Sequence, residues 1–171
     1  MLKLRRPHRH RLVAAATGAL LALGLVAAAP ASAAPRTAAP TPLVVNARWG
    51  GHCTFDRVVV DLQGHVPEVV VDRVPELVYD GSGKPVPLPG THFLEVRLHP
   101  AAAHDEAGQS VYRGPQLIQL NLPRLKGLAL TGDYEGYVTF GAAFTTRPEY
   151  TTFTLHDPER LVLDISHPNV C

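Results

Sequence analysis

Histidines and acids that could bind a metal are scattered through this 171-residue sequence. Of the histidines after residue 33, only His104 has two acids directly after it, in the stretch HDE at 104–106. Zinc sites draw their ligands from short spacings or from converging strands, and the other histidines show neither arrangement. Solvated side chains in a loop explain HDE better than a ligand set does, so we predict no metal site and no cofactor.

Residues of the kind used in catalysis are present without the patterns that activate them. Ser82 lies in GSG within a turn and lacks the G-x-S-x-G elbow of serine hydrolases. Asp133 and Glu135 flank Tyr134 and could form the paired carboxylates of a glycosidase. On a strand, however, these two carboxylates would share an exposed face, and no cleft is evident beside them. We therefore predict no catalytic residues and no enzymatic activity.

A binding surface is the better interpretation of GDYEGY at residues 132–137. A tyrosine ring can stack on a sugar or pack against a protein, while neighbouring carboxylates accept hydrogen bonds from hydroxyl groups. The stretch YRGPQ at 112–116 could serve the same purpose, although a core position is equally open to its tyrosine. The predicted binding residues are Asp133, Tyr134, Glu135, Tyr137, Tyr112 and Arg113.

Strand alternation limits how many of these tyrosines can be exposed. If residues 134–144 form one strand, Tyr134 and Tyr137 point to opposite faces, because successive side chains alternate. One of the two tyrosines is then expected in the core. The single tryptophan, Trp49, is also expected in the core rather than in a ligand site.

The N-terminus has the features of a secretory signal peptide. A basic start, MLKLRRPHRHR, precedes the apolar run LVAAATGALLALGLVAAA, and residues 31–33 form an A-x-A cleavage site. A membrane anchor is the competing interpretation, but Ala, Gly and Thr dilute the run and no charged stop-transfer segment follows it. We predict a signal peptide at 1–33 and a disordered linker of Ala, Pro and Thr at 34–42. The protein is then secreted, without a stable membrane anchor after cleavage, and free to associate with the cell wall.

The charge of the processed chain argues against nucleic acid as a partner. The sequence has 16 basic and 15 acidic residues, and five of the basic residues precede residue 33. The 11 basic residues that remain, set against the 15 acidic residues, give a net charge of −4. Binding to phosphates needs a basic patch, which this balance does not provide.

Period-two alternation of apolar and polar residues begins at Leu43 and continues along the chain. The expected strands cover residues 43–49, 55–62, 68–79, 91–99, 116–122, 125–131, 134–144, 150–156 and 160–166. Pro75 lies inside the third strand and indicates an edge or a bulge there, and residues 80–90 are expected to form a long turn. Many short strands at this spacing are typical of a sandwich or barrel. We predict an all-β, mostly antiparallel β-sandwich in a single domain at 43–171.

Two segments about a hundred residues apart share one pattern: FDRVVVDL at 55–62 and PERLVLDI at 158–165. On a strand, each segment has an apolar face and an Arg-Val-Asp face. Antiparallel pairing with Val59 beside Val162 opposes unlike charges, whereas the matching parallel register opposes like charges and costs stability. We predict that the two strands pair antiparallel and join the ends of the domain. The predicted charge pairs are Arg57 with Asp164 and Asp61 with Arg160.

The two cysteines, Cys53 and Cys171, are expected to form a disulfide, because the chain is predicted to enter an oxidising space. A metal ligand or a reactive thiol is the alternative, and neither cysteine has partners at suitable spacing. In the chain-entropy model a bond that closes a loop of this length contributes roughly 4 to 5 kcal/mol. Antiparallel pairing of the two similar segments would also bring the cysteines together.

Four motifs carry a family resemblance: HCTFDRVVVDL, DGSGKPVPL, GDYEGYVTFG and DPERLVLDI, in that order. Together they resemble the AMIN-like domain of secreted proteins and lipoproteins from high-GC Gram-positive bacteria, from about Val44 to Ser166. That family is related to the AMIN domain, a β-sandwich of cell-wall amidases and secretin proteins that directs its host to peptidoglycan or the envelope.

The resemblance implies a noncatalytic module that binds the cell envelope, through peptidoglycan or another wall polymer. It carries over no catalytic residues. A secreted protein-binding module, acting as an inhibitor or an assembly factor, is the second hypothesis. An envelope hydrolase is the third, and it would need a pocket where several histidines and acids converge.

Overall fold

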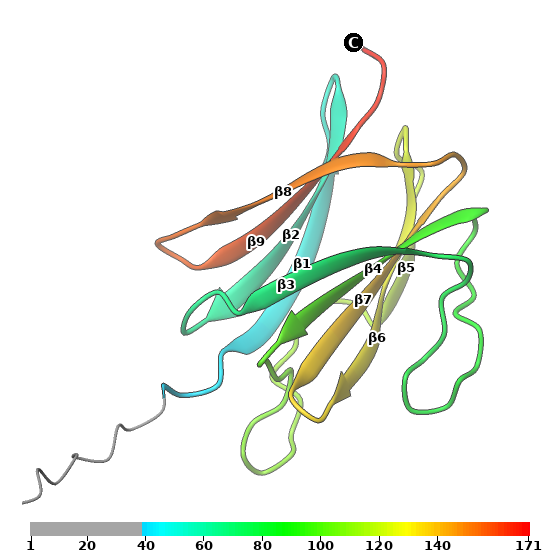
Figure 1. Cartoon of the computed structure of the whole chain (residues 1–171). Coiled ribbons are helices and arrows are strands. Elements are labelled where there is room, and N and C mark those ends of the chain that lie inside the picture. The colour runs from blue at the N-terminus through cyan, green and yellow to red at the C-terminus, as the bar shows by residue number, and fades with distance from the viewer. Residues whose placement is uncertain (1–38) are drawn as a thin grey trace, which may run out of the picture. The chain divides into compact units, whose positions relative to one another are not determined.

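The computed structural model describes residues 39–171, and these residues form nine strands and no helix (Figure 1). The predicted signal peptide at 1–33 and the linker up to residue 38 lie outside the described residues. The strands are β1 (Leu43–Gly51), β2 (Phe55–Gln63), β3 (Glu68–Val74), β4 (His92–His99), β5 (Leu117–Gln119), β6 (Leu125–Tyr134), β7 (Tyr137–Phe144), β8 (Glu149–Leu155) and β9 (Arg160–Ser166).

The strands form two sheets that face each other (Figure 1). One sheet has four strands in the order β1-β2-β9-β8, and the other has five in the order β3-β4-β7-β6-β5. Every neighbouring pair is antiparallel. The predicted all-β, antiparallel sandwich is therefore confirmed, and residues 39–171 form one compact unit.

The core lies between the sheets and follows directly from the alternation in the sequence. The inward-facing residues of β2, β9, β4 and β7 are buried, and all of them except Asp56 are apolar. These inward side chains are Val58, Val60, Leu62, Leu161, Leu163, Ile165, Leu94, Val96, Leu98, Val138, Phe140, Ala142 and Phe144. Trp49 is half-buried and packs against this core.

The segment at 75–90 covers part of the outer face of the five-stranded sheet. Leu77, Val86 and Leu88 form a second small core with Ala129 and Ala143. The expected strand at 68–79 ends at Val74 instead, because Pro75 has no N–H to continue the ladder. The chain can therefore leave the sheet edge and fold back over the sheet.

Other boundaries also differ from the prediction. The strand expected at 116–122 is shorter, and β5 covers only Leu117–Gln119. Pro42, assigned to the linker, is buried, and its carbonyl accepts a hydrogen bond from the N–H of Ala102. Ordered packing therefore begins just before the first strand.

The two similar segments pair as β2 and β9 in the predicted antiparallel register. Val59 lies opposite Val162, Arg57 opposite Asp164, and Asp61 opposite Arg160. This pair lies in the middle of the four-stranded sheet, with β1 and β8 on either side. The first and last parts of the domain are thus joined within one sheet.

Candidate functional site

The hairpin between β6 and β7 presents two exposed tyrosines. Its turn consists of Glu135 and Gly136, both in the left-handed region with φ of 49° and 79°. Such a two-residue turn sets the residues that flank it opposite each other. Tyr134 and Tyr137 are indeed cross-strand partners, and they are 68% and 44% exposed.

The expectation that one of these tyrosines is in the core is therefore wrong. That expectation assumed that residues 134–144 form a single strand with uninterrupted alternation. The turn at Glu135 and Gly136 interrupts that count, so Tyr134 and Tyr137 belong to different strands. Residues directly opposite in a ladder share a face.

Next to the two tyrosines lies an open groove of about 310 Å³, which we call the β6–β7 groove. It lies on the outer face of the five-stranded sheet, opposite the core-facing side chains of β7. Its lining comes from β4, from β6 and β7 with the turn between them, and from the 75–90 segment. The lining residues are Asp80, Glu95, Arg97, Tyr134, Glu135, Tyr137 and Thr139.

Asp80 is held in the groove by contacts with β6 and β7. Its N–H donates to the carbonyl of Thr131 at 3.0 Å, and its carboxylate accepts from the hydroxyl of Thr139 at 2.9 Å. Gly132 makes this approach possible, because a Cβ atom at that position would collide with the Asp80 carboxylate. The part of the 75–90 segment around Asp80 is thereby fixed beside the hairpin.

The groove has more hydrogen-bond acceptors than cations. Arg97 is its one cation, and it bonds Asp72 at 2.6 Å and lies 3.4 Å from Glu95. Burial raises the pKa of Glu95, Arg97 opposes this shift, and the nearby charges of Asp80 and Asp72 add to it. Glu135 has no hydrogen bond or ion pair from its side chain within residues 39–171. This balance favours a ligand that supplies hydroxyl or ammonium donors.

The two tyrosine rings differ in how firmly they are held. His99 stacks on Tyr137 with ring centroids 4.1 Å apart and an angle of 21° between the rings. One face of Tyr137 is therefore covered by a side chain from the neighbouring strand β4. Tyr134 is the more exposed of the two and offers its ring more freely.

Asp133 is not part of the groove. Its carboxylate accepts a hydrogen bond from the N–H of Ala103 at 3.0 Å and lies 2.7 Å from Nδ1 of His104. Side chains alternate along β6, so Asp133 faces away from Tyr134 and anchors the loop after β4. Glu135 lies in the turn, so Asp133 and Glu135 do not share a strand face as expected.

Tyr112 and Arg113 are also separate from the groove lining. Tyr112 is only 8% exposed, packs against Phe140, and donates from its hydroxyl to the carbonyl of Pro115. Burial raises the pKa of Tyr112 to about 12. Arg113 is exposed, and its N–H donates to the carbonyl of Val45. Of the six predicted binding residues, the structure brings together Tyr134, Glu135 and Tyr137.

The charge pairs on the four-stranded sheet are formed in part as expected. Arg57 and Asp164 make two hydrogen bonds of 2.7 Å. Asp61 does not bond Arg160 but accepts two hydrogen bonds of 2.8 Å from Arg48. The side chain of Arg160 turns instead to backbone carbonyls of the β8–β9 turn.

The ion pair of Arg48 with Asp61 was not predicted, because only the two strands of similar sequence, β2 and β9, were expected to pair. The strand β1 pairs with β2 on its other side, and Arg48 lies on the same outer face as Asp61. Hydrogen bonding to Arg48 lowers the pKa of Asp61, against the smaller opposing effect of burial. The sequence did contain a signal for this ion pair: Arg48 is the only charged residue of the mostly apolar strand β1.

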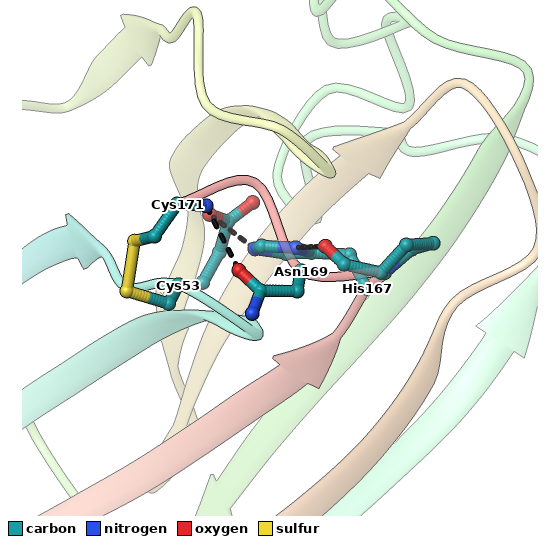
Figure 2. The surroundings of a disulfide bond; sticks show 6 residues. Cys53, His167, Asn169 and Cys171 are labelled. Carbon is teal, nitrogen blue, oxygen red and sulfur yellow. Dashed lines mark hydrogen bonds and ion pairs between the residues drawn. A yellow bond between two sulfur atoms is a disulfide. The ribbon is translucent and has the colours of Figure 1, made fainter.

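A disulfide joins Cys53 and Cys171, which are 118 residues apart in the sequence (Figure 2). Within 39–171 there is no free cysteine. The disulfide indicates an oxidising, extracellular location. Beside it, Asn169 accepts a hydrogen bond from the N–H of Cys171 at 2.8 Å.

Sequence reasoning missed a buried carboxylate near this disulfide. Asp56 is fully buried and accepts hydrogen bonds from the N–H groups of Arg124 and Leu125 at 2.7 and 2.8 Å. Nδ1 of His167 donates to the carbonyl of Pro168, and its Nε2 lies 3.4 Å from Asp56. The signal was the alternation in β2, which places an acid on the apolar face.

Residues 39–171 contain no group of three or more His, Cys, Asp or Glu side chains arranged to hold a metal ion. In this part of the chain no helix is long and apolar enough to cross a membrane.

The comparison with protein families gives one match. The family model for the AMIN-like domain matches residues 42–167. No curated protein matches the chain, and no solved structure matches it either. Because the family match covers most of the sequence, including all nine strands, the chain belongs to the AMIN-like domain family.

Proposed function

We propose that this protein is a secreted, noncatalytic module that binds a glycan of the cell envelope, peptidoglycan or another wall polymer, through the β6–β7 groove. AMIN-like membership suggests a noncatalytic module of the cell envelope. The observation that carries the proposal is the pair of exposed tyrosines beside a groove rich in carboxylates.

The chemistry of the groove suits a sugar polymer. Sugar rings have apolar faces that pack on aromatic rings, and Tyr134 offers such a ring next to Tyr137. Asp80, Glu95 and Glu135 provide acceptors for the hydroxyl groups around the sugar ring. The groove is open along the surface, which a continuous polymer requires.

The disulfide supports an extracellular location for this activity. The predicted signal peptide at 1–33, with its A-x-A site, supplies a route of export. In an oxidising space the bond between Cys53 and Cys171 persists, so the groove would be carried by a domain whose ends are covalently joined.

Sedimentation of residues 34–171 with insoluble peptidoglycan tests the proposal. We expect the wild type to pellet and the variant Tyr134→Ala, Glu135→Gln to stay in solution. Loss of a central aromatic contact costs about 2 kcal/mol, or about thirtyfold in Kd. Glutamine at 135 keeps the size of the side chain in the strained turn, so the variant tests the charge and not the backbone.

Two control variants make the result specific. Tyr134→Phe keeps the ring and is expected to pellet like the wild type. Glu106→Gln removes an exposed acid from the loop after β4 and is also expected to pellet. If the wild type stays in the supernatant with peptidoglycan and with other wall polymers, the proposed glycan binding is wrong.

A further inference from the structure

The sandwich has four edge strands, and two of them are covered or short. The edge of β1 is covered by the 101–113 segment, because Val44 donates to the carbonyl of Ala102 and the N–H of Arg113 donates to Val45. The edge strand β5 has only three residues. Neither edge offers a long row of free backbone groups to another chain.

The third edge, β3, is protected by side chains. The hydroxyl of Tyr150 donates to the carbonyl of Val71 at 3.1 Å, which occupies one of the edge acceptors. Arg73 donates to the carbonyl of Pro148 at 3.0 Å and ties β3 to the segment before β8. Asp72 and Arg73 also place charges on this strand, as protected edges commonly do.

The fourth edge, β8, has one charge, Glu149 at its first residue, and none of the other protections. Its seven residues, EYTTFTL, pair with β9 in an unbroken register, and among residues 39–171 no strand pairs with its other side (Figure 1). From Tyr150 to Leu155 the strand contains no charge, proline, glycine or bulge. Phe153 and Leu155 are 37% and 36% exposed on its outer face. Natural proteins rarely leave such an edge unpaired.

A hollow runs beside this edge between the two sheets. It measures about 470 Å³ and is lined by Thr152 and Thr154 of β8 together with Val66, Val69 and Leu161. The lining is mostly apolar, and it lies where the inward side chains of one more strand would project. The hollow and the free backbone groups therefore suit the same occupant, an extended strand.

We propose that this occupant is β8 of a second copy, paired antiparallel about a two-fold axis at Thr152. In that register Thr152 faces the partner's Thr152, and Tyr150 faces the partner's Thr154. The only charged residue of the strand, Glu149, faces the partner's Leu155. No like charges are opposed, whereas parallel pairing in register would set the two Glu149 carboxylates side by side.

The two-fold arrangement accounts for the exposed residues of the strand. Each Phe153 lies opposite the partner's Thr151, so the two phenylalanine rings become diagonal neighbours on the outer face, within contact range for aromatic side chains. The pairing is self-complementary and closed, so it joins two copies and leaves no β8 edge for a third. The two four-stranded sheets become one continuous sheet of the dimer.

Light scattering during size-exclusion chromatography tests this proposal on residues 34–171. We expect a wild-type dimer whose fraction rises with protein concentration. Thr152→Lys and Thr152→Glu each oppose two like charges at the axis and are expected to be monomers. An equimolar mixture of the two variants opposes unlike charges, and we expect it to recover the dimer. Recovery would exclude misfolding as the reason for the monomers.

Cysteine cross-linking tests the register. In the variant Thr152→Cys, the two introduced cysteines of the dimer would lie opposite each other at a distance that a disulfide can span. We therefore expect a covalent dimer on oxidation. In the variant Thr154→Cys, the two introduced cysteines would be offset by four residues along the paired strands. This variant is therefore not expected to form a covalent dimer. A wild type that remains monomeric at every soluble concentration overturns the proposal, even if β8 then captures another protein. Equal cross-linking of both cysteine variants would overturn it as well.

Discussion

The β2–β9 pair and the β6–β7 hairpin use similar residues in opposite ways. On the outer face of β2 and β9 the carboxylates are bonded by arginines: Asp164 by Arg57, and Asp61 by Arg48. On the hairpin, Glu135 has no such partner within 39–171, and Tyr134 is mostly exposed. The difference shows that residue type alone does not distinguish a structural site from a candidate binding site. What distinguishes them is whether the protein already satisfies the polar groups.

The two regions also differ in their attachment to the rest of the domain. The start of β2 and the end of β9 lie next to the disulfide and to buried Asp56. On the hairpin, the side chains of Tyr134, Glu135 and Tyr137 are exposed to solvent. Changes near β2 and β9 should therefore alter stability, whereas changes in the hairpin should alter binding and leave stability almost unchanged.

The largest effect is expected from removing the disulfide. Replacing Cys53 and Cys171 by serine frees a loop of 118 residues in the unfolded chain. The free energy of unfolding should fall by about 4 kcal/mol, because the unfolded state gains conformational entropy. Urea denaturation at neutral pH measures the change. A loss below about 1 kcal/mol would show that the bond hardly restricts the unfolded chain.

The second largest effect is expected at Asp56. Asparagine at this position keeps the shape but removes a charge that two backbone N–H groups and His167 face. We expect Asp56→Asn to lower the free energy of unfolding by about 2 kcal/mol, the cost of poorly satisfied buried groups. Asp164→Asn, on the partly exposed outer face, is the matched control and should cost less. Equal losses in both variants would remove the distinction between the buried and the outer carboxylate.

The fold was largely predictable from the sequence because its signals are local and repeated. Alternation with period two gave the strands and the sandwich, and the opposed charges of β2 and β9 gave their register. A charge pair constrains register strongly, since a slip of one residue reverses every side chain. The same logic failed for Asp61, because β1 supplies Arg48 from a third strand.

The candidate site was less predictable because it depends on a turn and on a distant segment. Whether Tyr134 and Tyr137 share a face is decided by two turn residues, Glu135 and Gly136, that interrupt the alternation. The groove also needs Asp80, which reaches the hairpin from about fifty residues earlier in the chain. No periodic pattern in the sequence reports where such an irregular segment folds back.

A smaller effect is expected from pH, and it should have opposite signs in the two regions. The pKa of Asp61 is lowered by Arg48, so its contribution to stability is present above the unfolded pKa and is lost as pH falls through the folded pKa. The pKa of Glu95, in the groove, is raised by burial. Its contribution is present below the unfolded pKa, and it is lost as pH rises through the folded pKa.

These signs predict how two substitutions behave. At pH 7 Asp61→Asn should be less stable than the wild type, and the difference should shrink as pH falls through the lowered folded-state pKa of Asp61. Glu95→Gln should be slightly more stable at pH 7, with the difference also vanishing in acid. Each change should be less than about 1 kcal/mol, because both sites are partly exposed to solvent. Urea midpoints across the acid range measure both, and a stabilising Asp61→Asn would contradict the assigned ion pair.

The smallest effect on stability is expected from Tyr134→Ala, the substitution that should matter most for binding. Tyr134 is 68% exposed, so its removal should change the free energy of unfolding by no more than about 0.5 kcal/mol. Tyr112→Ala is the informative contrast, because this buried ring packs on Phe140 and its loss should cost about 3 kcal/mol. Thermal and urea unfolding of the two variants measure the loss in free energy of unfolding for an exposed tyrosine and for a core tyrosine. Similar losses would mean that the hairpin tyrosine supports the fold, and its exposure would then no longer argue for a ligand.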